Sequence, residues 1–402
     1  MKKPCRIAFI STMMPTPTNV GGPSSLPYQL IAHRPEGIDV VVYTLNQNHI
    51  DGNKLTEYAR QMRCSVTVVH ASLRYRLCNT LGLRWIVYRF HSMPFQTLIS
   101  LPADDVEKIN TNHDIAWLYP HYLLGIGRQI GLPMIVTGPD SSALHYERCL
   151  YDKYALMQFG QKCIIKMRQH SLRLESSWAS LPNTQLHFVG NADCQYFLSN
   201  NPQGRGFFLR HPSNMPAYLC PKTYGDQRRR LRLLITGKLN VYTLSDMDIV
   251  VNELCLHAQP LCEEYLLTFV GNGWGDVADT LRQHGYEAAC KTWVADYFEE
   301  LKQHDLQLFP ISVGTGTKGK VLDALCAGIV CVGSRYAFEN IALQESLSAY
   351  CYDDAHQIGD ILQRIYEQQE KLSAVAAAGH DMVLAQHSPT DLASEFFKHF
   401  EQ

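Results

Sequence analysis

The chain has 402 residues, of which 46% are hydrophobic and 18% are charged, and its formal net charge is -2. A chain of this length can bury more than one core, because single cores stop growing near roughly 250 to 300 residues, so two domains are expected. The nearly balanced charge gives no bulk attraction to nucleic acid or to an anionic membrane, so binding to either would need a local patch. We expect no nucleic-acid partner.

Cysteine usage and the N-terminus indicate the compartment. The thirteen cysteines include no Cys-x-x-Cys pair, which favours core thiols in a reducing cytoplasm over zinc ligands or disulfides. The apolar run from Arg6 to Ile10 ends at Ser11, too early for a signal peptide. No window holds the roughly eighteen apolar residues that a membrane-spanning helix needs. The expected location is cytoplasmic.

Short apolar runs alternate with helical patterns along the chain, which is typical of parallel α/β layers. In the first half we predict strands at residues 6–10, 39–44, 65–70, 114–119, 133–137 and 185–189. Prolines interrupt the alternation between residues 206 and 227. It then resumes with strands at 231–236, 265–270, 290–294, 306–311, 329–332 and 350–352, and a capped helix follows residue 387. These patterns predict an α/β protein with two doubly wound halves, whose ligands bind beyond the carboxyl ends of the strands.

The stretch from Phe309 to Ser334 predicts a buried strand, a glycine-rich turn, a helix and a second buried strand. Glycines in such a turn let the backbone come close to a ligand, and the N-terminus of the following helix favours an anion. Lys318 and Lys320 add positive charge at that same end, where a cation opposes the helix dipole. The pattern therefore predicts a site for an anion such as phosphate, with Asp323 placed to receive ribose hydroxyls.

The run Gly-Thr-Gly-Thr-Lys-Gly-Lys-Val-Leu-Asp-Ala-Leu from Gly314 to Leu325 resembles the nucleotide-sugar loop of GT-B glycosyltransferases of family 4, the "group 1" transferases. The resemblance implies a GT-B fold of two Rossmann-like domains facing a central cleft. It implies an acceptor-side domain at residues 1–210, a linker at 211–227 and a nucleotide-sugar-binding domain at 228–386. The helix at 387–402 would pack back on the N-terminal domain.

Carried across residue by residue, the resemblance marks three positions in the first half. Gly21 and Gly22 match the family's glycine pair, which faces the donor diphosphate, although an ordinary turn would also use such a pair. Asp140 falls where the family carries an acidic residue at the end of a strand, and it would assist the acceptor hydroxyl. The alternative for Asp140 is capping of a helix that begins near Ser141. His121 is a second candidate for the acceptor.

In the second half the resemblance assigns the donor. Lys238 matches a cation that meets the diphosphate opposite Lys318, and the position of the family's second cation in that loop is Thr243. The family's paired acids fall on Thr315 and Asp323, which leaves the sugar without its side-chain carboxylate. For Asp323 the alternative to ribose binding is a surface pair with Lys320. Asp296 is expected to cap a helix. The expected donor-binding set is Gly21, Gly22, Lys238, Gly314, Thr315, Gly316, Thr317, Lys318 and Asp323.

The implied reaction is transfer of a sugar from a nucleoside diphosphate to an acceptor with retention of configuration. The expected acceptor is a glycan or a lipid-linked molecule. Lys318, Lys238 and Asp140 are the expected catalytic residues, and the lysines take the place of a metal, so no metal or other cofactor is expected. The expected role is synthesis of a bacterial surface polysaccharide or other glycoconjugate. Two alternatives stay open: a GT-B nucleotide-sugar epimerase, and a non-catalytic nucleotide-sugar-binding protein.

Basic and aromatic residues lie close together at residues 74–76, 84–89 and 162–168. Such a face can rest on anionic lipid and meet a lipid-linked acceptor at the inner face of the cytoplasmic membrane. A solvated helix face over a normal core is the alternative.

Overall fold

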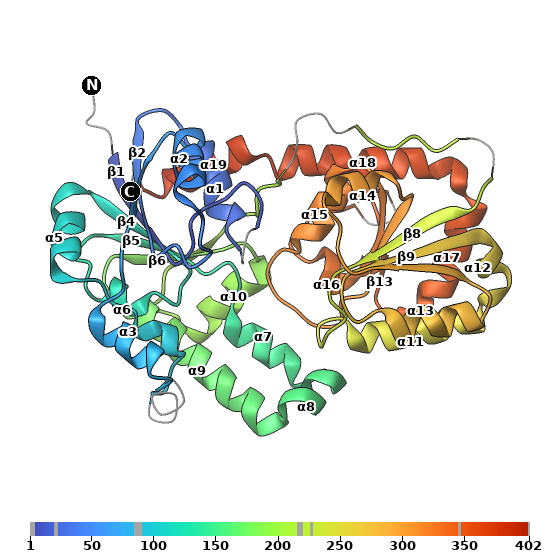
Figure 1. Cartoon of the computed structure of the whole chain (residues 1–402), viewed down its shortest axis with the longest axis horizontal. Helices are drawn as coiled ribbons and strands as arrows, with labels where there is room; N and C mark the ends of the chain where they lie inside the picture. The colour runs from blue at the N-terminus through green and yellow to red at the C-terminus, as the bar shows by residue number, and fades with distance from the viewer. Residues whose placement is uncertain are drawn as a thin grey trace. The chain divides into compact units, whose positions relative to one another are not determined.

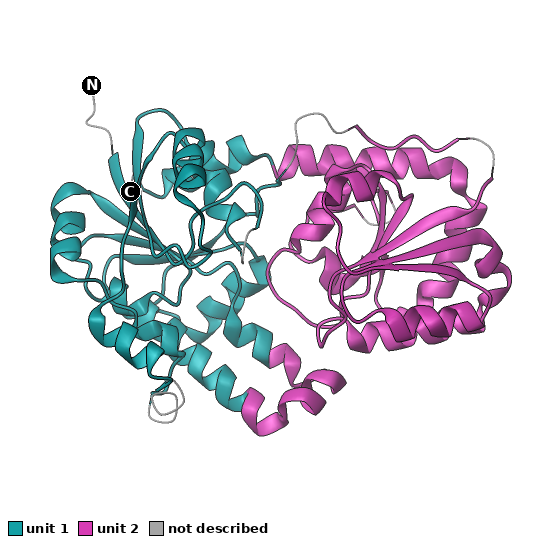
Figure 2. Ribbon diagram, in the orientation of Figure 1, with its two compact units in different colours: residues 1–146, 165–214, 388–402 teal, residues 147–164, 215–387 magenta. Residues whose placement is uncertain are grey.

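The protein is described from a computed structural model, and the structure describes residues 5–19, 23–83, 91–214, 220–225, 228–344 and 347–400. Within these ranges the chain forms two compact units of strands and helices (Figure 1). Unit 1 comprises residues 1–146, 165–214 and 388–402, and unit 2 comprises residues 147–164 and 215–387 (Figure 2). Residues 147–164, which the expected boundaries assign to the N-terminal domain, belong to unit 2.

Unit 1 is built on a parallel sheet that, in the described residues, has seven strands in the order β3-β2-β1-β4-β5-β6-β7. The inner strand β1 buries its residues from Ile7 to Ile10 completely, because helices cover both faces of a parallel sheet. The strands are β1 (Cys5–Ser11), β2 (Ile38–Thr44), β3 (Ser65–Val68), β4 (Ile115–Tyr119), β5 (Met134–Thr137), β6 (Thr184–Phe188) and β7 (Gly206–Phe208).

The helices of unit 1 are α1 (Ser25–Ala32), α2 (Gly52–Gln61), α3 (Leu73–Thr80), α5 (Ala103–Asn112), α6 (Leu124–Gly127), α10 (Asn191–Asn200) and α19 (Pro389–Lys398). The last of these brings an aromatic cluster to the sheet. The ring of Phe396 lies 4.7 Å from that of Trp117, which lies 4.4 Å from that of Phe9. All three side chains are fully buried. The end of the chain therefore completes the core of the unit with which the chain begins.

Two helices run from one unit into the other along the chain. They are α7 (Ser142–Cys149) and α9 (Gln161–Ala179), with α8 (Lys153–Phe159) between them. The side chain of Asp152 caps α8 by accepting a hydrogen bond from Ala155 N at 2.8 Å, and it also accepts one from Ser245 Oγ at 2.6 Å. Residues 147–164 are therefore held to unit 2 by specific contacts as well as by packing.

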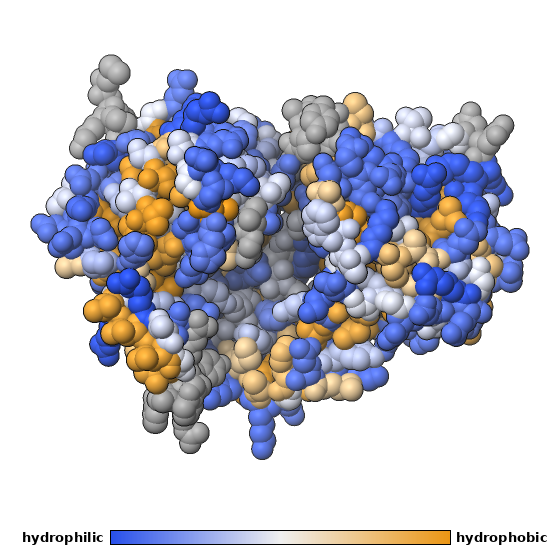
Figure 3. All heavy atoms as spheres, in the orientation of Figure 1, coloured by the Kyte–Doolittle hydropathy of each residue, from blue (hydrophilic) through white to orange (hydrophobic). Residues whose placement is uncertain are grey.

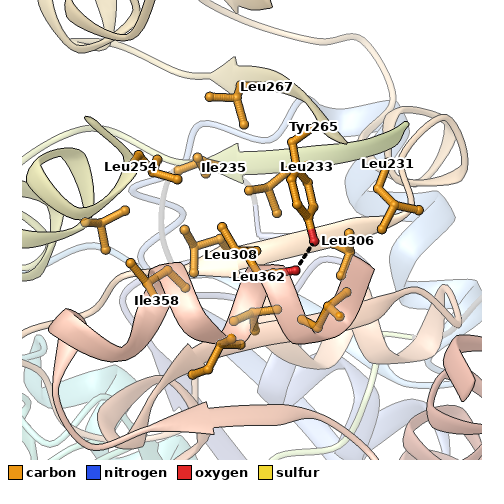
Figure 4. Close-up of a cluster of buried hydrophobic side chains, with 14 of the residues drawn as sticks. Leu231, Leu233, Ile235, Leu254, Tyr265, Leu267, Leu306, Leu308, Ile358 and Leu362 are labelled. Carbon is orange, nitrogen blue, oxygen red and sulfur yellow. Dashed lines mark hydrogen bonds between the residues drawn. The ribbon is translucent and has the colours of Figure 1, made fainter. Parts of the chain in front are cut away.

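Unit 2 is built on a second parallel sheet that, in the described residues, has six strands in the order β10-β9-β8-β11-β12-β13. Leucines from β8, β9 and β11 form its core with helix α17 (Ile358–Glu367), and Tyr265 OH donates to Leu362 O at 2.6 Å (Figure 4). The strands are β8 (Leu231–Thr236), β9 (Tyr265–Val270), β10 (Glu287–Lys291), β11 (Leu306–Phe309), β12 (Val330–Ser334) and β13 (Tyr350–Tyr352).

The helices of unit 2 are α11 (Leu244–Leu256), α12 (Ala258–Glu264), α13 (Gly275–Gln283), α14 (Tyr297–Lys302), α15 (Gly319–Cys326), α16 (Arg335–Phe338), α17 (Ile358–Glu367) and α18 (Leu372–Gln386). With two such sheets the predicted α/β class and its two doubly wound halves are confirmed. None of the helices in the described ranges is both long enough and apolar enough to cross a membrane.

Two edge strands differ from the prediction. The three-residue strand β7 was not predicted, and β10 lies at Glu287–Lys291 rather than at residues 290–294. Both strands lie at a sheet edge, where one side of the strand has no neighbour among the described residues and the side chains stay partly exposed. Strand β7 is an apolar segment of only three residues, too short to show a pattern, and β10 is mostly polar. The prediction for the β10 region was wrong because it followed the apolar pair Trp293 and Val294.

Candidate active site

The glycine-rich turn follows β11, and the loop after the neighbouring strand β8 lies beside it. The two loops are joined by a hydrogen bond from Ser312 N to Tyr242 O at 2.9 Å. Parallel strands end at the same edge of a sheet, so β8 and β11 bring both loops to one place. The loop that carries Lys238 and the loop that carries Lys318 therefore form one surface of unit 2.

The carbonyl oxygens of the glycine-rich turn are bound by side chains. Lys318 Nζ donates to Thr315 O at 3.0 Å and to Gly316 O at 3.1 Å, and Asn340 Nδ2 donates to Gly316 O at 3.0 Å. Gly316 has a φ of 64°, which is strained for residues with a side chain. Lys318 is the N-cap residue of α15, and in this structure its ammonium contacts its own turn. Its contact with a phosphate stays a prediction.

Two further lysines lie on the loop after β8 and in the first turn of α15. Lys238 is exposed on the loop after β8. The Nζ of Lys320 lies 3.2 Å from the point where a side chain on Gly237 would begin, and Gly237 has a φ of 114°. The loop after β8 therefore passes close to the ammonium of Lys320 because it has a glycine there. The structure therefore places the ammonium of Lys320 beside the loop after β8.

Asp323 lies on α15, one turn after its start, and its side chain is half-buried. Burial raises the pKa of this carboxyl to about 7, and the charge of Lys320 opposes that rise. Burial also lowers the pKa of Lys320, while the charge of Asp323 raises it. The two groups thus stabilise each other's charged forms. Asp323 is poised between its neutral and charged forms near neutral pH, a state that burial produces and the sequence does not reveal.

Unit 1 has a cavity of about 320 Å³ at the carboxyl ends of β1, β4 and β5. Asp140 and His121, which were predicted separately, both line it. Burial lowers the pKa of His121 to about 4, so the imidazole is neutral at pH 7. Its Nδ1 is buried and makes no hydrogen bond within the described ranges. Gly138 permits this position, because a Cβ there would lie 2.9 Å from that nitrogen. The cavity therefore combines an exposed carboxylate and a neutral imidazole.

The start of α7, next to Asp140, is held by a buried acidic pair that sequence reasoning missed. Ser141 N donates to Asp193 Oδ1 at 2.7 Å, and Ser141 Oγ donates to Glu175 Oε1 at 2.7 Å. Leu144 N in turn donates to Ser141 Oγ at 3.2 Å. Burial raises the pKa of Glu175 to about 7. Ser141 therefore acts as a cap of α7, and the role of Asp140 toward an acceptor stays a prediction.

Of the remaining predicted positions, Asp296 is confirmed and the others lie outside the described residues. Asp296 caps α14, as predicted, by accepting hydrogen bonds from Phe298 N at 2.8 Å and Glu299 N at 3.1 Å. Gly21 and Gly22 lie outside the described residues, as does the basic stretch at 84–89. Arg148, which was not predicted, donates to Gly314 O in the glycine-rich turn.

Comparison with known proteins gives the class. A family model of glycosyl transferase-like proteins matches residues 254–398, which include the glycine-rich turn. No curated protein matches the chain. The chain is similar in structure to Anabaena HepE in complex with UDP-glucose, with a TM-score of 0.62, 13% identity, and coverage of 98% of this chain and 99% of that one.

Two further structures are similar over their full length. Sucrose-phosphate synthase from Thermosynechococcus elongatus has a TM-score of 0.67 and 12% identity, with 99% of this chain and 98% of that chain covered. The lipopolysaccharide outer core galactosyltransferase WaaB in its apo form has a TM-score of 0.59 and 12% identity, with 98% and 99% covered.

These matches establish the GT-B fold for the whole chain. Together with the glycosyl transferase-like domain at residues 254–398, they identify the protein as an enzyme, a GT-B glycosyltransferase.

Proposed function

We propose that this glycosyltransferase moves a sugar from a nucleoside diphosphate to an acceptor hydroxyl with retention of configuration, in the synthesis of a bacterial surface glycan. The observation that carries the donor class is the glycine-rich turn, whose carbonyls are bound by Lys318 at the start of α15 and by Asn340 after α16. HepE, which has the same fold, binds UDP-glucose, and WaaB is a lipopolysaccharide galactosyltransferase.

In the proposed mechanism the protein stabilises the leaving diphosphate as the glycosidic bond breaks. Negative charge then grows on the bridging oxygen, and preorganised cations and N–H dipoles lower the barrier. Lys318, Lys238 and Lys320 supply the cations without a resident metal, and the amides from Gly314 to Thr317 supply the dipoles. Asp323 receives the ribose. The sugar is then transferred to an acceptor hydroxyl that Asp140 or His121 orients.

Replacing Lys318 tests the donor site. Removing one stabilising group of this kind typically costs about a hundredfold or more in rate, so Lys318→Met should lower sugar transfer by about that factor. Lys302→Met is the matched control, since Lys302 lies in the same unit and pairs with the exposed Glu299. Equal transfer by wild type and Lys318→Met would contradict the assigned role. Background rates in both would favour the non-catalytic binding protein.

The identity of the donor is accessible by thermal shift. A ligand that binds only the folded state stabilises it by about 2.7 kcal/mol at a concentration of one hundred times its Kd. A panel of nucleotide sugars should therefore raise the melting temperature for one base and sugar above the rest. If no member of the panel raises it, the proposal of a nucleotide-sugar donor is wrong.

We further propose that helix α3 contacts the anionic inner face of the membrane, where a lipid-linked acceptor is found. Hydrophobic residues gather over α3 at the lower left of the surface (Figure 3). Leu73, Leu77 and Leu81 recur every four residues and are 63%, 51% and 67% exposed. No acidic residue occurs between Glu57 and Asp104, whereas this stretch holds several arginines. An apolar stripe within a purely basic stretch suits an anionic lipid surface.

Flotation with vesicles tests this surface. Wild type should float with vesicles containing anionic phospholipid and less with zwitterionic ones, and Leu73→Glu with Leu77→Glu should abolish flotation. Leu256→Glu is the control, because Leu256 is 77% exposed in unit 2. Flotation that survives both the leucine changes and reversal of Arg74 and Arg76 to Glu overturns the membrane proposal.

A further inference from the structure

Arg148 lies 166 residues before the glycine-rich turn, yet it binds the turn directly. It stands near the end of α7, in the segment 147–164 that belongs to unit 2. Its Nη1 donates to Gly314 O at 2.5 Å and to Glu339 Oε2 at 2.7 Å, and its Nη2 donates to Glu339 Oε1 at 2.6 Å. The guanidinium also lies 5.0 Å from the centre of the Tyr336 ring. One planar group thus joins three parts of unit 2.

Stability alone does not account for this pair. The side chains of Arg148 and Glu339 are only 15% and 20% exposed. Withdrawing two charges from water costs free energy that their attraction offsets only in good geometry, so a buried ion pair is weak evidence for stability. A bidentate pair does fix the orientation of the guanidinium strongly. The pair is therefore better suited to placing the third contact, the one to Gly314 O.

That contact sets the direction of a peptide plane. A trans peptide points its carbonyl and the N–H of the next residue to opposite sides. Binding Gly314 O to Arg148 thus directs the N–H of Thr315 to the other side of the plane. Lys318 and Asn340 do the same for the next two carbonyls. Asn340 directly follows Glu339, so one short segment after α16 supports both ends of the turn.

We propose that Arg148 is a positioning residue for the donor diphosphate: held by Glu339, it fixes the Gly314 peptide so that the following amide faces the phosphates. This rests on the proposed function of the turn. Because Glu339 neutralises the guanidinium, Arg148 acts through geometry and not through added positive charge. A lysine at this position would keep the charge but lose the fork that reaches three oxygens at once.

The test compares variants by their affinity for ligands with and without phosphates. From UDP, GDP, ADP and dTDP, the diphosphate that wild type binds with the lowest Kd is chosen, together with its nucleoside. Arg148→Met and Arg148→Lys should each raise the Kd for the diphosphate at least tenfold and leave the Kd for the nucleoside unchanged. Arg335→Met is the matched control, because Arg335 on α16 pairs with Asp353 and both are exposed.

The outcomes separate the two proposals. If wild type binds a diphosphate and Arg148→Met binds it equally well, the role of Arg148 is overturned and the proposed function stands. Rescue by Arg148→Lys overturns the geometric account. A parallel loss of nucleoside affinity shows general structural damage and overturns the specific role. If wild type binds none of the four diphosphates, the proposed function fails and this inference with it.

Discussion

Donor affinity should depend on pH through a single residue, Asp323. Burial raises its pKa to about 7, so the carboxyl is half protonated at neutral pH. A charged carboxylate accepts hydrogen bonds from two ribose hydroxyls better than the neutral acid does. Donor affinity should therefore rise as pH increases through about 7.

The measurement is the Kd of the donor between pH 6 and pH 8.5 in wild type and in Asp323→Asn. The variant should bind more weakly and without this rise, since an amide does not titrate. The same rise in both proteins would mean that another group is responsible.

Single residues also show where sequence reasoning reaches its limit. The run from Gly314 to Asp323 is local, and the chemistry of glycine turns and lysines predicts an anion site from it. Arg148 and Glu339 are 191 residues apart and belong to no motif. Their pairing arises because residues 147–164 fold with unit 2, whereas the residues on both sides of this segment fold with unit 1. No local sequence pattern reveals such a pairing. The contacts of Ser141 with Glu175 and Asp193 were not predicted either, because they also join distant parts of the chain.

At the scale of elements, α19 should contribute strongly to the stability of unit 1. Phe396 is fully buried between Trp117, His187 and neighbouring rings. Truncating a buried Phe to Ala typically costs about 3 to 5 kcal/mol. Phe396→Ala should lower the free energy of unfolding of unit 1 by that amount in urea titrations, whereas Leu81→Ala, at a site of unit 1 that is 67% exposed, should change it little. A small loss for Phe396→Ala would mean that α19 packs loosely.

The packing of α19 on β6 has an acid-sensitive point. His187 is fully buried, and burial lowers its pKa to about 3. In the unfolded chain its pKa is about 6.5, so below that pH the unfolded state binds a proton that the folded state does not bind. The stabilisation is complete above pH 6.5 and is lost progressively toward pH 3. The loss reaches up to about 2 kcal/mol by pH 5.

Urea unfolding at pH 7.5 and pH 5 measures this effect. His187→Asn keeps a polar atom near the position of Nδ1, which contacts Thr137 Oγ1 at 3.1 Å, but does not titrate. The variant should lose less stability on acidification than wild type does. Burial of Glu175 has the opposite sign, because a raised carboxyl pKa favours the folded state as pH falls. The comparison of the two proteins cancels that contribution.

Inner strands were predicted closely, whereas edge strands were predicted unevenly: β3 and β13 lie close to their predicted ranges, and β7 and β10 do not. The inner strands, such as β1 and β8, are continuous apolar runs because helices cover both faces, and they lie where predicted. The edge strands β7 and β10 are short or polar and were missed or displaced. Helix α8 was not predicted; it folds as part of unit 2, where Asp152 caps it and accepts a hydrogen bond from Ser245.

For the whole molecule, the division into units predicts which fragments can fold. Unit 1 contains residues 388–402 in addition to stretches within the first 214 residues. A fragment of residues 1–214 lacks α19 and would expose Phe9 and Trp117, so it should bind a hydrophobic dye and unfold without a sharp transition. Joining residues 388–402 to it through a flexible linker of about 20 residues should restore a cooperative transition. Equal behaviour of both fragments would contradict the role of α19.

The place of α19 in the chain also governs the order of events on the ribosome. Domains generally fold as they emerge, beginning with the N-terminal one. Here the last contributor to the first unit is made only after residues 215–387, which complete unit 2, have been synthesised. Until then, part of the aromatic core of the first sheet stays exposed. The growing chain most needs protection from aggregation during that interval.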